Sequence, residues 1–232
     1  MFNLNKKSKA SYIIDVNAYK VERQIPSAFF DNIEKYSKAK DFGCPANKSM
    51  KNRLYYIPAF ADLDIEFGIK DAEEYYKFVY DEKQLPINEL VHKLLNEIFF
   101  LGIAKNNVLN FQATLPYLFV TDDKELEIMS IVPNVKAVNA EYALGSFYPY
   151  GWLRHINSAW ISKDTSKPSY ITYRKGEPMV FILFNKPVDL KRINMNDKIK
   201  EYRDTHIFST SYTVNAINYF KKVINFRPKK LL

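Results

Sequence analysis

Residues 108–120 read VLNFQATLPYLFV, and this stretch decides the fold class. It is rich in β-branched and aromatic residues, which favours a β-strand. A polar turn at residues 121–124 and the run ELEIMSIV come next, so the pattern predicts a hairpin of two strands. No helical segment separates the two runs. This order indicates an antiparallel sheet rather than a doubly wound parallel one.

More strand-like runs follow this first pair in the second half of the chain. They cover residues 142–147, 159–162, 169–174 and 179–184. A turn sequence, Lys-Gly-Glu-Pro at residues 175–178, lies between the last two runs, which are the clearest pair.

The first half and the end of the chain read mostly as helical. Apolar spacing, possible capping residues and Gly or Pro stops predict helices. They span residues 27–43, 71–82, 88–102, 196–205 and 214–224. A strand-like run at residues 11–21 precedes the first of these helices, and two more, at residues 54–58 and 63–67, lie between the first helix and the second. We therefore expect a single compact α+β domain over residues 1–232, with an antiparallel β sandwich or barrel at its core and helices mainly from the first half and the C-terminus.

Composition limits the function classes. A single cysteine, Cys44, permits no internal disulfide, and no signal peptide or long apolar stretch predicts secretion or a membrane span. The sequence has no Walker, dinucleotide-binding or nucleophile-elbow motif, so we expect no cofactor. The formal net charge of +8 favours nucleic acid as a partner, although scattered lysines also simply keep a surface soluble.

Three candidates for chemistry remain. Asp62, Asp64 and Glu66 alternate with apolar residues, so they lie on one face of the predicted strand, as carboxylates of two-metal nucleases do. The same alternation describes any half-exposed strand. Cys44 precedes a proline that suits a helix start, which would activate its thiol, or it belongs to a buried turn. With no base, second acidic motif or histidine pair beside these candidates, we predict no metal site and no catalytic residue, and a non-enzymatic protein is favoured.

Segment 145–154, GSFYPYGWLR, is the most distinctive stretch, because aromatic residues, Pro and Gly surround one Arg. Such a loop can anchor a protein partner or stack on bases. It can equally seal one end of a β core. The predicted partner-binding residues are Tyr148, Tyr150, Trp152, Arg154 and His155.

Short motifs spread along most of the chain support a resemblance. They are Cys44-Pro45-Ala46 with Asn52, Pro58 and Asp62-Leu63, then Leu115 to Phe119, then Gly145-x-Phe147 with Trp152 and Arg154, then Arg174-x-Gly176-Glu177-Pro178. Together they resemble an uncharacterised family encoded by marine T4-like bacteriophages of cyanobacteria and related hosts. The resemblance implies a viral protein in the host cytoplasm or the virion, with no established activity. The sequence departs from the family at Leu153 and His155, where the family has an aromatic residue and a proline.

Three functions follow as expectations. The first is a phage accessory or structural protein that binds a protein partner or itself as a homo-oligomer through segment 145–154. The second is a nucleic-acid-binding protein or metal-dependent nuclease that uses the carboxylate row. The third is a cupin-like barrel for a small ligand, in which the turn at residues 175–178 forms part of the wall.

Overall fold

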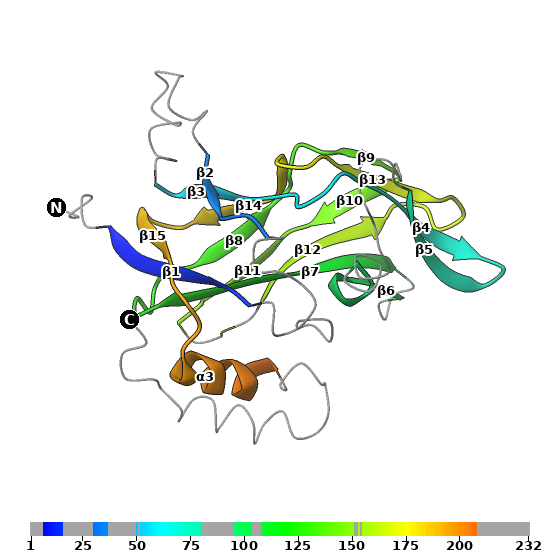
Figure 1. Cartoon of the computed structure of the whole chain (residues 1–232). Helices are drawn as coiled ribbons and strands as arrows, with labels where there is room; N and C mark the ends of the chain where they lie inside the picture. Colours follow the sequence, from blue (N-terminus) through cyan, green and yellow to red (C-terminus); the bar gives the residue numbers. More distant parts are fainter. Residues whose placement is uncertain are drawn as a thin grey trace.

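The computed structural model describes residues 7–15, 30–36, 50, 52–79, 95–103, 108–150, 153 and 155–207, and strands dominate this part of the chain (Figure 1). The strands form three open sheets, here named A, B and C. Every pairing but one among these strands is antiparallel. The predicted β-rich fold with antiparallel sheets is confirmed. A closed barrel is not formed by the described strands.

Sheet A contains the longest strand, β7 (Leu109–Thr121). Its strands run in the order β10 (Ala140–Ala143), β12 (His155–Ser162), β7, β1 (Ser8–Ile14) and β15 (Val188–Arg192). A sixth strand, β6 (Phe99–Ile103), pairs with the first part of β7, on the side where β1 pairs with the last part. The one parallel pairing joins β1 and β15.

Sheets B and C are smaller. Sheet B has the order β11 (Gly145–Phe147), β8 (Ile128–Ile131), β14 (Pro178–Phe184), β3 (Leu54–Pro58) and β2 (Glu34–Lys35). Sheet C has the order β5 (Glu73–Val79), β4 (Leu63–Lys70), β13 (Ser169–Tyr173) and β9 (Lys136–Val138). Strands β10 and β11 are separated only by Leu144, so one bent segment passes from sheet A to sheet B.

The hydrophobic core lies between sheet A on one side and sheets B and C on the other (Figure 1). Phe111 of sheet A stacks on Phe67 of sheet C, with ring centroids 5.0 Å apart. Phe119 of sheet A meets Phe184 of sheet B edge to face at 6.1 Å. Full burial of each such ring contributes about 2 to 3 kcal/mol. These aromatic pairs therefore join sheet A to both of the other sheets.

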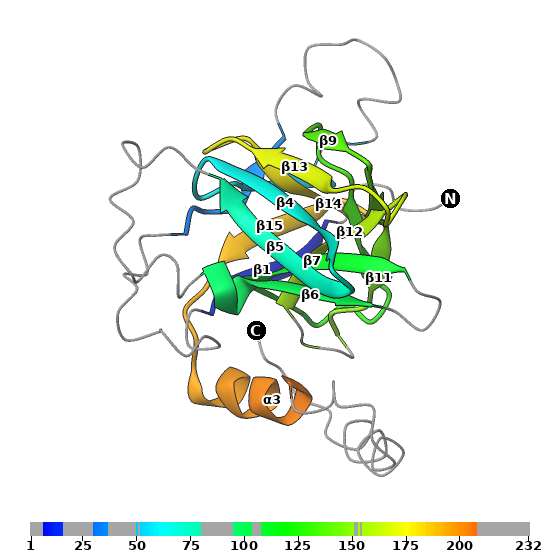
Figure 2. The ribbon, with the colours of Figure 1, turned by 90° about the vertical axis from the view of Figure 1, so that its right-hand side faces the viewer.

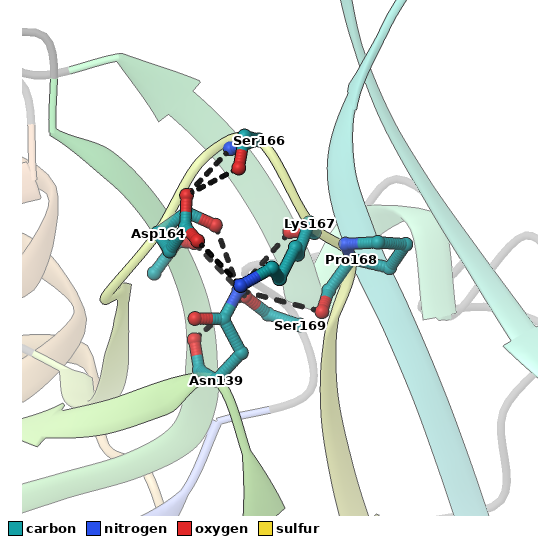
Figure 3. A network of polar contacts seen from close by, with 7 residues as sticks. Asn139, Asp164, Ser166, Lys167, Pro168 and Ser169 are labelled. Carbon is teal, nitrogen blue, oxygen red and sulfur yellow. Dashed lines mark hydrogen bonds and ion pairs between the residues drawn. The ribbon is translucent and has the colours of Figure 1, made fainter.

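Polar contacts connect sheets A and C at one end (Figure 3). Asn139, between β9 and β10, has a positive φ of 55°, a conformation that asparagine tolerates better than most residues. Its Nδ2 donates hydrogen bonds to the carbonyl oxygens of Asp164 and Lys167 at 2.7 and 3.0 Å. The Ser169 hydroxyl donates to the Asn139 carbonyl oxygen at 2.8 Å. One asparagine thus fixes the turn that carries the chain from β12 to β13.

The hairpin predicted over residues 108–132 is wrong in its pairing, although its two strands are confirmed. Strand β7 belongs to sheet A, whereas β8 belongs to sheet B. The turn predicted at residues 175–178 does lie between two strands, of which β13 belongs to sheet C and β14 to sheet B. Each of these strands has a buried apolar face, and that face is covered by strands across the core, whichever strand pairs with its edge. The two turns therefore lead from one sheet to another.

The predicted helix over residues 71–82 is also wrong, since β4 and β5 form a hairpin there. Asp71 and Ala72 both have positive φ, 53° and 65°, as the two central residues of a type I′ turn require. After the turn, Tyr76 and Phe78 pack against the core while Tyr75 bonds to Glu66 on the outer side. Side chains that alternate between the core and the outer side, with a period of two, therefore make this segment a strand.

Most of the other predicted helices fall partly outside the described residues. Within residues 27–43, Glu34 and Lys35 form β2 and pair with β3, so a continuous helix is wrong there. Within residues 88–102, a helical turn at residues 95–98 leads directly into β6. The helix predicted over residues 196–205 is confirmed as α3 (Asp197–Ile207), whose first turn is capped because Ile199 N donates to Asn196 Oδ1 at 3.0 Å. Residues 214–224 lie outside the described part.

Candidate functional site

The outer face of β7, turned away from the core, is divided into two halves. Leu118 and Val120 lie in the half that is completely buried. Asn110, Gln112 and Thr114 lie in the other half and remain partly exposed. The burial pattern of β7 changes accordingly, from strict alternation over its first residues to continuous burial over its last. We name these two parts the covered half and the open half.

Helix α3 covers the covered half, on the side of sheet A that faces away from sheets B and C (Figures 1 and 2). Ile199 of α3 is fully buried in a small apolar cluster that is separate from the main core. The other buried members of this cluster are Ile13, Leu118, Val120 and Leu153. Apolar contact between one helix and two strands therefore closes this part of the sheet.

A groove of about 290 Å³ lies over the open half. Strands β7 and β12 form its floor, and the bent segment of β10 and β11 forms a wall. Its lining residues are Val108, Asn110, Gln112, Ser130, Ala143, Leu144, Gly145, Ser146, Phe147, His155, Ile156, Asn157, Ala159 and Ile161. A volume of this size suits a small ligand or one group of a larger partner.

The groove is polar without being strongly charged. Asn110, Gln112 and Asn157 bring three side-chain amides to its floor, and Ser146 adds a hydroxyl on its wall. Its described lining includes no Lys, Arg, Asp or Glu. The Oδ1 atom of Asn110 is buried without a hydrogen-bond partner among the described residues. An unpaired buried acceptor costs about 1 to 3 kcal/mol, so this amide is not there for stability.

A buried ionic cluster lies at the boundary between the two halves. Asp15, which follows β1, accepts from Arg203 Nη1 of α3 at 2.8 Å and contacts His155 Nε2 at 3.2 Å. The side chains of Asp15, His155 and Arg203 are only 0%, 9% and 7% exposed. Pro116, which has no N–H, lies at an irregularity in the pairing of β7 with β12 here, and its carbonyl oxygen accepts from Asp15 N. The cluster joins α3 to sheet A and places His155 at the end of the groove.

The predicted partner-binding segment borders this groove, although not all of it lies within the described residues. Tyr148 is 51% exposed, and Leu144, one residue before β11, is 68% exposed. The ring of Tyr150 is half-buried, with Lys124 Nζ 5.7 Å from its centroid. Trp152 and Arg154 lie outside the described part. His155 lines the groove but is mostly buried against Asp15, as just described.

The carboxylate row of β4 does alternate with buried residues, as predicted. Each carboxylate has its own partner. Asp62 accepts from Lys175 N at 2.7 Å, Asp64 pairs with Arg174 at 3.1 Å, and Glu66 pairs with Lys77 at 2.9 Å. Partial burial raises the pKa of Glu66, but hydrogen bonds from Lys77 and Tyr75 outweigh it and leave that pKa below its ordinary value. The row is therefore compensated by basic and hydrogen-bonding neighbours.

The pKa of Tyr75 shows the other side of this contact. Partial burial, the hydrogen bond to Glu66 and the charge of that carboxylate together raise the pKa of the Tyr75 phenol to about 12. The tyrosine therefore stays protonated at neutral pH and acts as a fixed donor to Glu66. Among the described residues, no group of three or more His, Cys, Asp or Glu side chains could hold a metal ion.

The remaining candidate for chemistry, Cys44, lies outside the described residues. Within the described part, no helix is both long enough and apolar enough to cross a membrane.

Sequence reasoning missed Asn110 and Gln112, although both stand in the stretch that decided the fold. The sequence does contain a signal for these two residues, because alternate positions of β7 read Asn, Gln, Thr, Pro, Leu and Val from residue 110 to residue 120. A polar to apolar change along one face indicates that one end is covered and the other is open.

Comparison with protein-family models, with curated proteins and with solved structures finds no match for this chain.

Proposed function

We propose that this is a non-catalytic binding protein whose open half of β7 holds a polar ligand or a polar group of a partner. The observation that carries the proposal is the unpartnered Asn110 carbonyl in a groove with two further amides. Asn110 can turn about its last side-chain bond, which exchanges its oxygen and nitrogen, so a donor in the groove can satisfy the oxygen. The unfavourable energy of the free protein is then recovered on binding.

The covered half supports this proposal by contrast. Leu118 and Val120 show that the same face of the same strand can be apolar and closed by a helix. Apolar residues at positions 110 and 112 would form a larger apolar patch for a second element to cover. The chain instead has amides there, in a groove that the exposed Leu144 also lines. Polar groups that converge beside exposed apolar side chains are typical of binding sites.

A binding role agrees with the expected viral accessory or structural protein in the host cytoplasm or the virion, which stays a prediction. We also propose that the two layers form an α+β sandwich, with α3 as its covering helix. Nucleic-acid binding stays a prediction for surfaces outside the groove, because the described groove lining offers no Lys or Arg to neutralise phosphates. A DNA titration at two salt concentrations tests it.

The proposal is tested by saturation-transfer NMR with a mixture of neutral sugars, amino acids, nucleosides and tripeptides. We expect the wild-type protein to bind at least one of these classes. We expect the double variant Asn110→Ala with Gln112→Ala to lose that binding, because it removes both central amides. The variant Asn134→Ala, at an exposed asparagine after β8 that is outside the groove lining, should bind as the wild type does.

Two results would contradict the proposal. One is that the wild-type protein binds none of the four classes. The other is that the double variant, shown by circular dichroism to be folded, binds the same molecules equally well.

A further inference from the structure

The groove over the open half combines donors and acceptors in a way that selects among ligand classes. Each amide of Asn110, Gln112 and Asn157 carries a donor and an acceptor within one planar group. The hydroxyl of Ser146 also donates and accepts. Hydroxyl groups on neighbouring ring carbons match such pairs, because each hydroxyl also donates and accepts.

Charge excludes the common anionic ligands. The chain has 34 lysines and arginines and a net charge of +8, yet none of these side chains belongs to the described groove lining. A phosphate or carboxylate would enter the groove without a cation to replace its hydration, which is strongly unfavourable. His155 lines the groove, but its Nε2 already contacts Asp15. The ligand group is therefore neutral.

The shape of the groove fits one sugar ring. A volume of about 290 Å³ is at the lower end of the range for small-molecule sites, so the groove has room for a single pyranose ring. Ala143, Ala159 and Ile161 supply apolar contact for the C–H face of such a ring. Phe100 of β6 is 61% exposed and lies directly beside Gln112 in the sheet register, so an aromatic surface is available for a second ring.

A peptide fits this site less well. Extended peptides are recognised by addition to a sheet edge, where free main-chain N–H and C=O groups are available. The floor of the groove lies on the face of β7 and β12, whose main-chain groups already bond to each other. On this floor, only side chains can bind a ligand.

We propose that the groove binds a neutral saccharide, with one sugar ring over Asn110 and Gln112; this inference rests on the proposed binding function. The amides fix the orientation of the ring hydroxyls, and the alanines contact the face of the ring. Free sugars and the glycans of a larger partner share this chemistry.

The test is saturation-transfer NMR and calorimetry with the methyl glycosides of glucose, galactose, mannose and N-acetylglucosamine. Glucuronic acid and glucose 6-phosphate serve as charged analogues of the same size. We expect at least one neutral glycoside to bind, and its affinity to exceed that of the charged analogues by tenfold or more. We expect Asn110→Ala to weaken this binding at least fivefold, whereas the matched variant Asn134→Ala leaves it unchanged. A disaccharide should bind more tightly than its single ring if Phe100 contacts the second ring.

The inference is overturned if no neutral glycoside binds, if the charged analogues bind equally well, or if folded Asn110→Ala retains full affinity. Its failure is distinguishable from failure of the proposed function. If sugars do not bind but nucleosides or tripeptides do, and the Asn110→Ala variant loses them, the binding function holds and the saccharide inference falls. If a neutral glycoside binds the wild-type protein and the folded double variant Asn110→Ala with Gln112→Ala equally, both fail.

Discussion

The two halves of the outer face of β7 differ in composition although they belong to one strand. In the covered half, Leu118 and Val120 pack beneath α3. In the open half, Asn110 and Gln112 line a groove instead. Both halves belong to the same sheet: β6 and β12 flank the open half, and the covered half pairs with β1 throughout and with β12 at Leu118. The side chains of β7, rather than its backbone pairing, therefore decide which half is closed by α3 and which half stays open, where we propose that a ligand binds.

The ionic cluster at the boundary should show the largest effect. The variant Asp15→Ala leaves Arg203 and His155 buried without their carboxylate, which costs about 3 to 5 kcal/mol. The free energy of unfolding, measured by urea denaturation, should fall by this amount. The exposed pair of Asp189 with Lys191 provides the control, since Asp189→Ala should change stability by less than about 1 kcal/mol. Equal effects of the two variants would show that the cluster does not hold α3.

Truncation within each half tests the comparison directly. Leu118→Ala leaves a cavity under α3 and should cost about 3 kcal/mol. Gln112→Ala removes a partly exposed side chain from the open half and should change stability by no more than about 0.5 kcal/mol. Urea denaturation of both variants measures the contrast. Similar losses in both halves would mean that the open half is also structural.

A substitution at Asn110, in the open half, should instead raise stability. Asn110→Val removes the unpaired carbonyl and places a β-branched residue in the strand, so we expect a gain of about 1 kcal/mol. The same variant should lose ligand binding, as a site that trades stability for function requires. Thermal unfolding and the NMR screen measure the two effects. A clear loss of stability would show that Asn110 supports the fold.

A substitution of Glu66 in sheet C, away from β7, should have only a small effect on stability. The pKa of Glu66 is lowered in the folded state, so its contribution to stability is present above the unfolded pKa and is lost as the pH falls through the lower folded value. Wild type and Glu66→Gln should therefore differ by under about 1 kcal/mol at pH 6, and the difference should shrink at pH 3. Unfolding curves at the two pH values measure it. A difference that grows on acidification would contradict the assigned contacts with Lys77 and Tyr75.

The sequence allowed prediction of most described strands but of few of their pairings. Strand signals are local, because the alternation in residues 63–67 or 179–184 already shows a buried face. Pairing depends on segments far apart, so the hairpin over residues 108–132 was predicted incorrectly. The helix predicted over residues 71–82 failed because Glu-Glu-Tyr-Tyr-Lys-Phe-Val fits both periods, and Asp-Ala is an unusual pair for a turn with two positive φ values.

The residues of the candidate site also differ in whether the sequence predicts them. The amides of Asn110 and Gln112 could have been found, since they break an apolar series on one face of a predicted strand. The ionic cluster could not, because Asp15 and Arg203 are 188 residues apart and neither stands in a recognisable motif. The groove itself depends on the bend between β10 and β11, which a strand pattern over residues 142–147 does not reveal.

The most direct test follows the side-chain amides by ¹⁵N NMR while the four-class ligand mixture is added. We expect the NH₂ resonances of Asn110 and Gln112 to shift, whereas that of Asn139, which bonds to Asp164 and Lys167 outside the groove lining, should not. Shifts confined to residues outside the groove, or no shifts at all, would contradict the claim that the open half of β7 is the binding site.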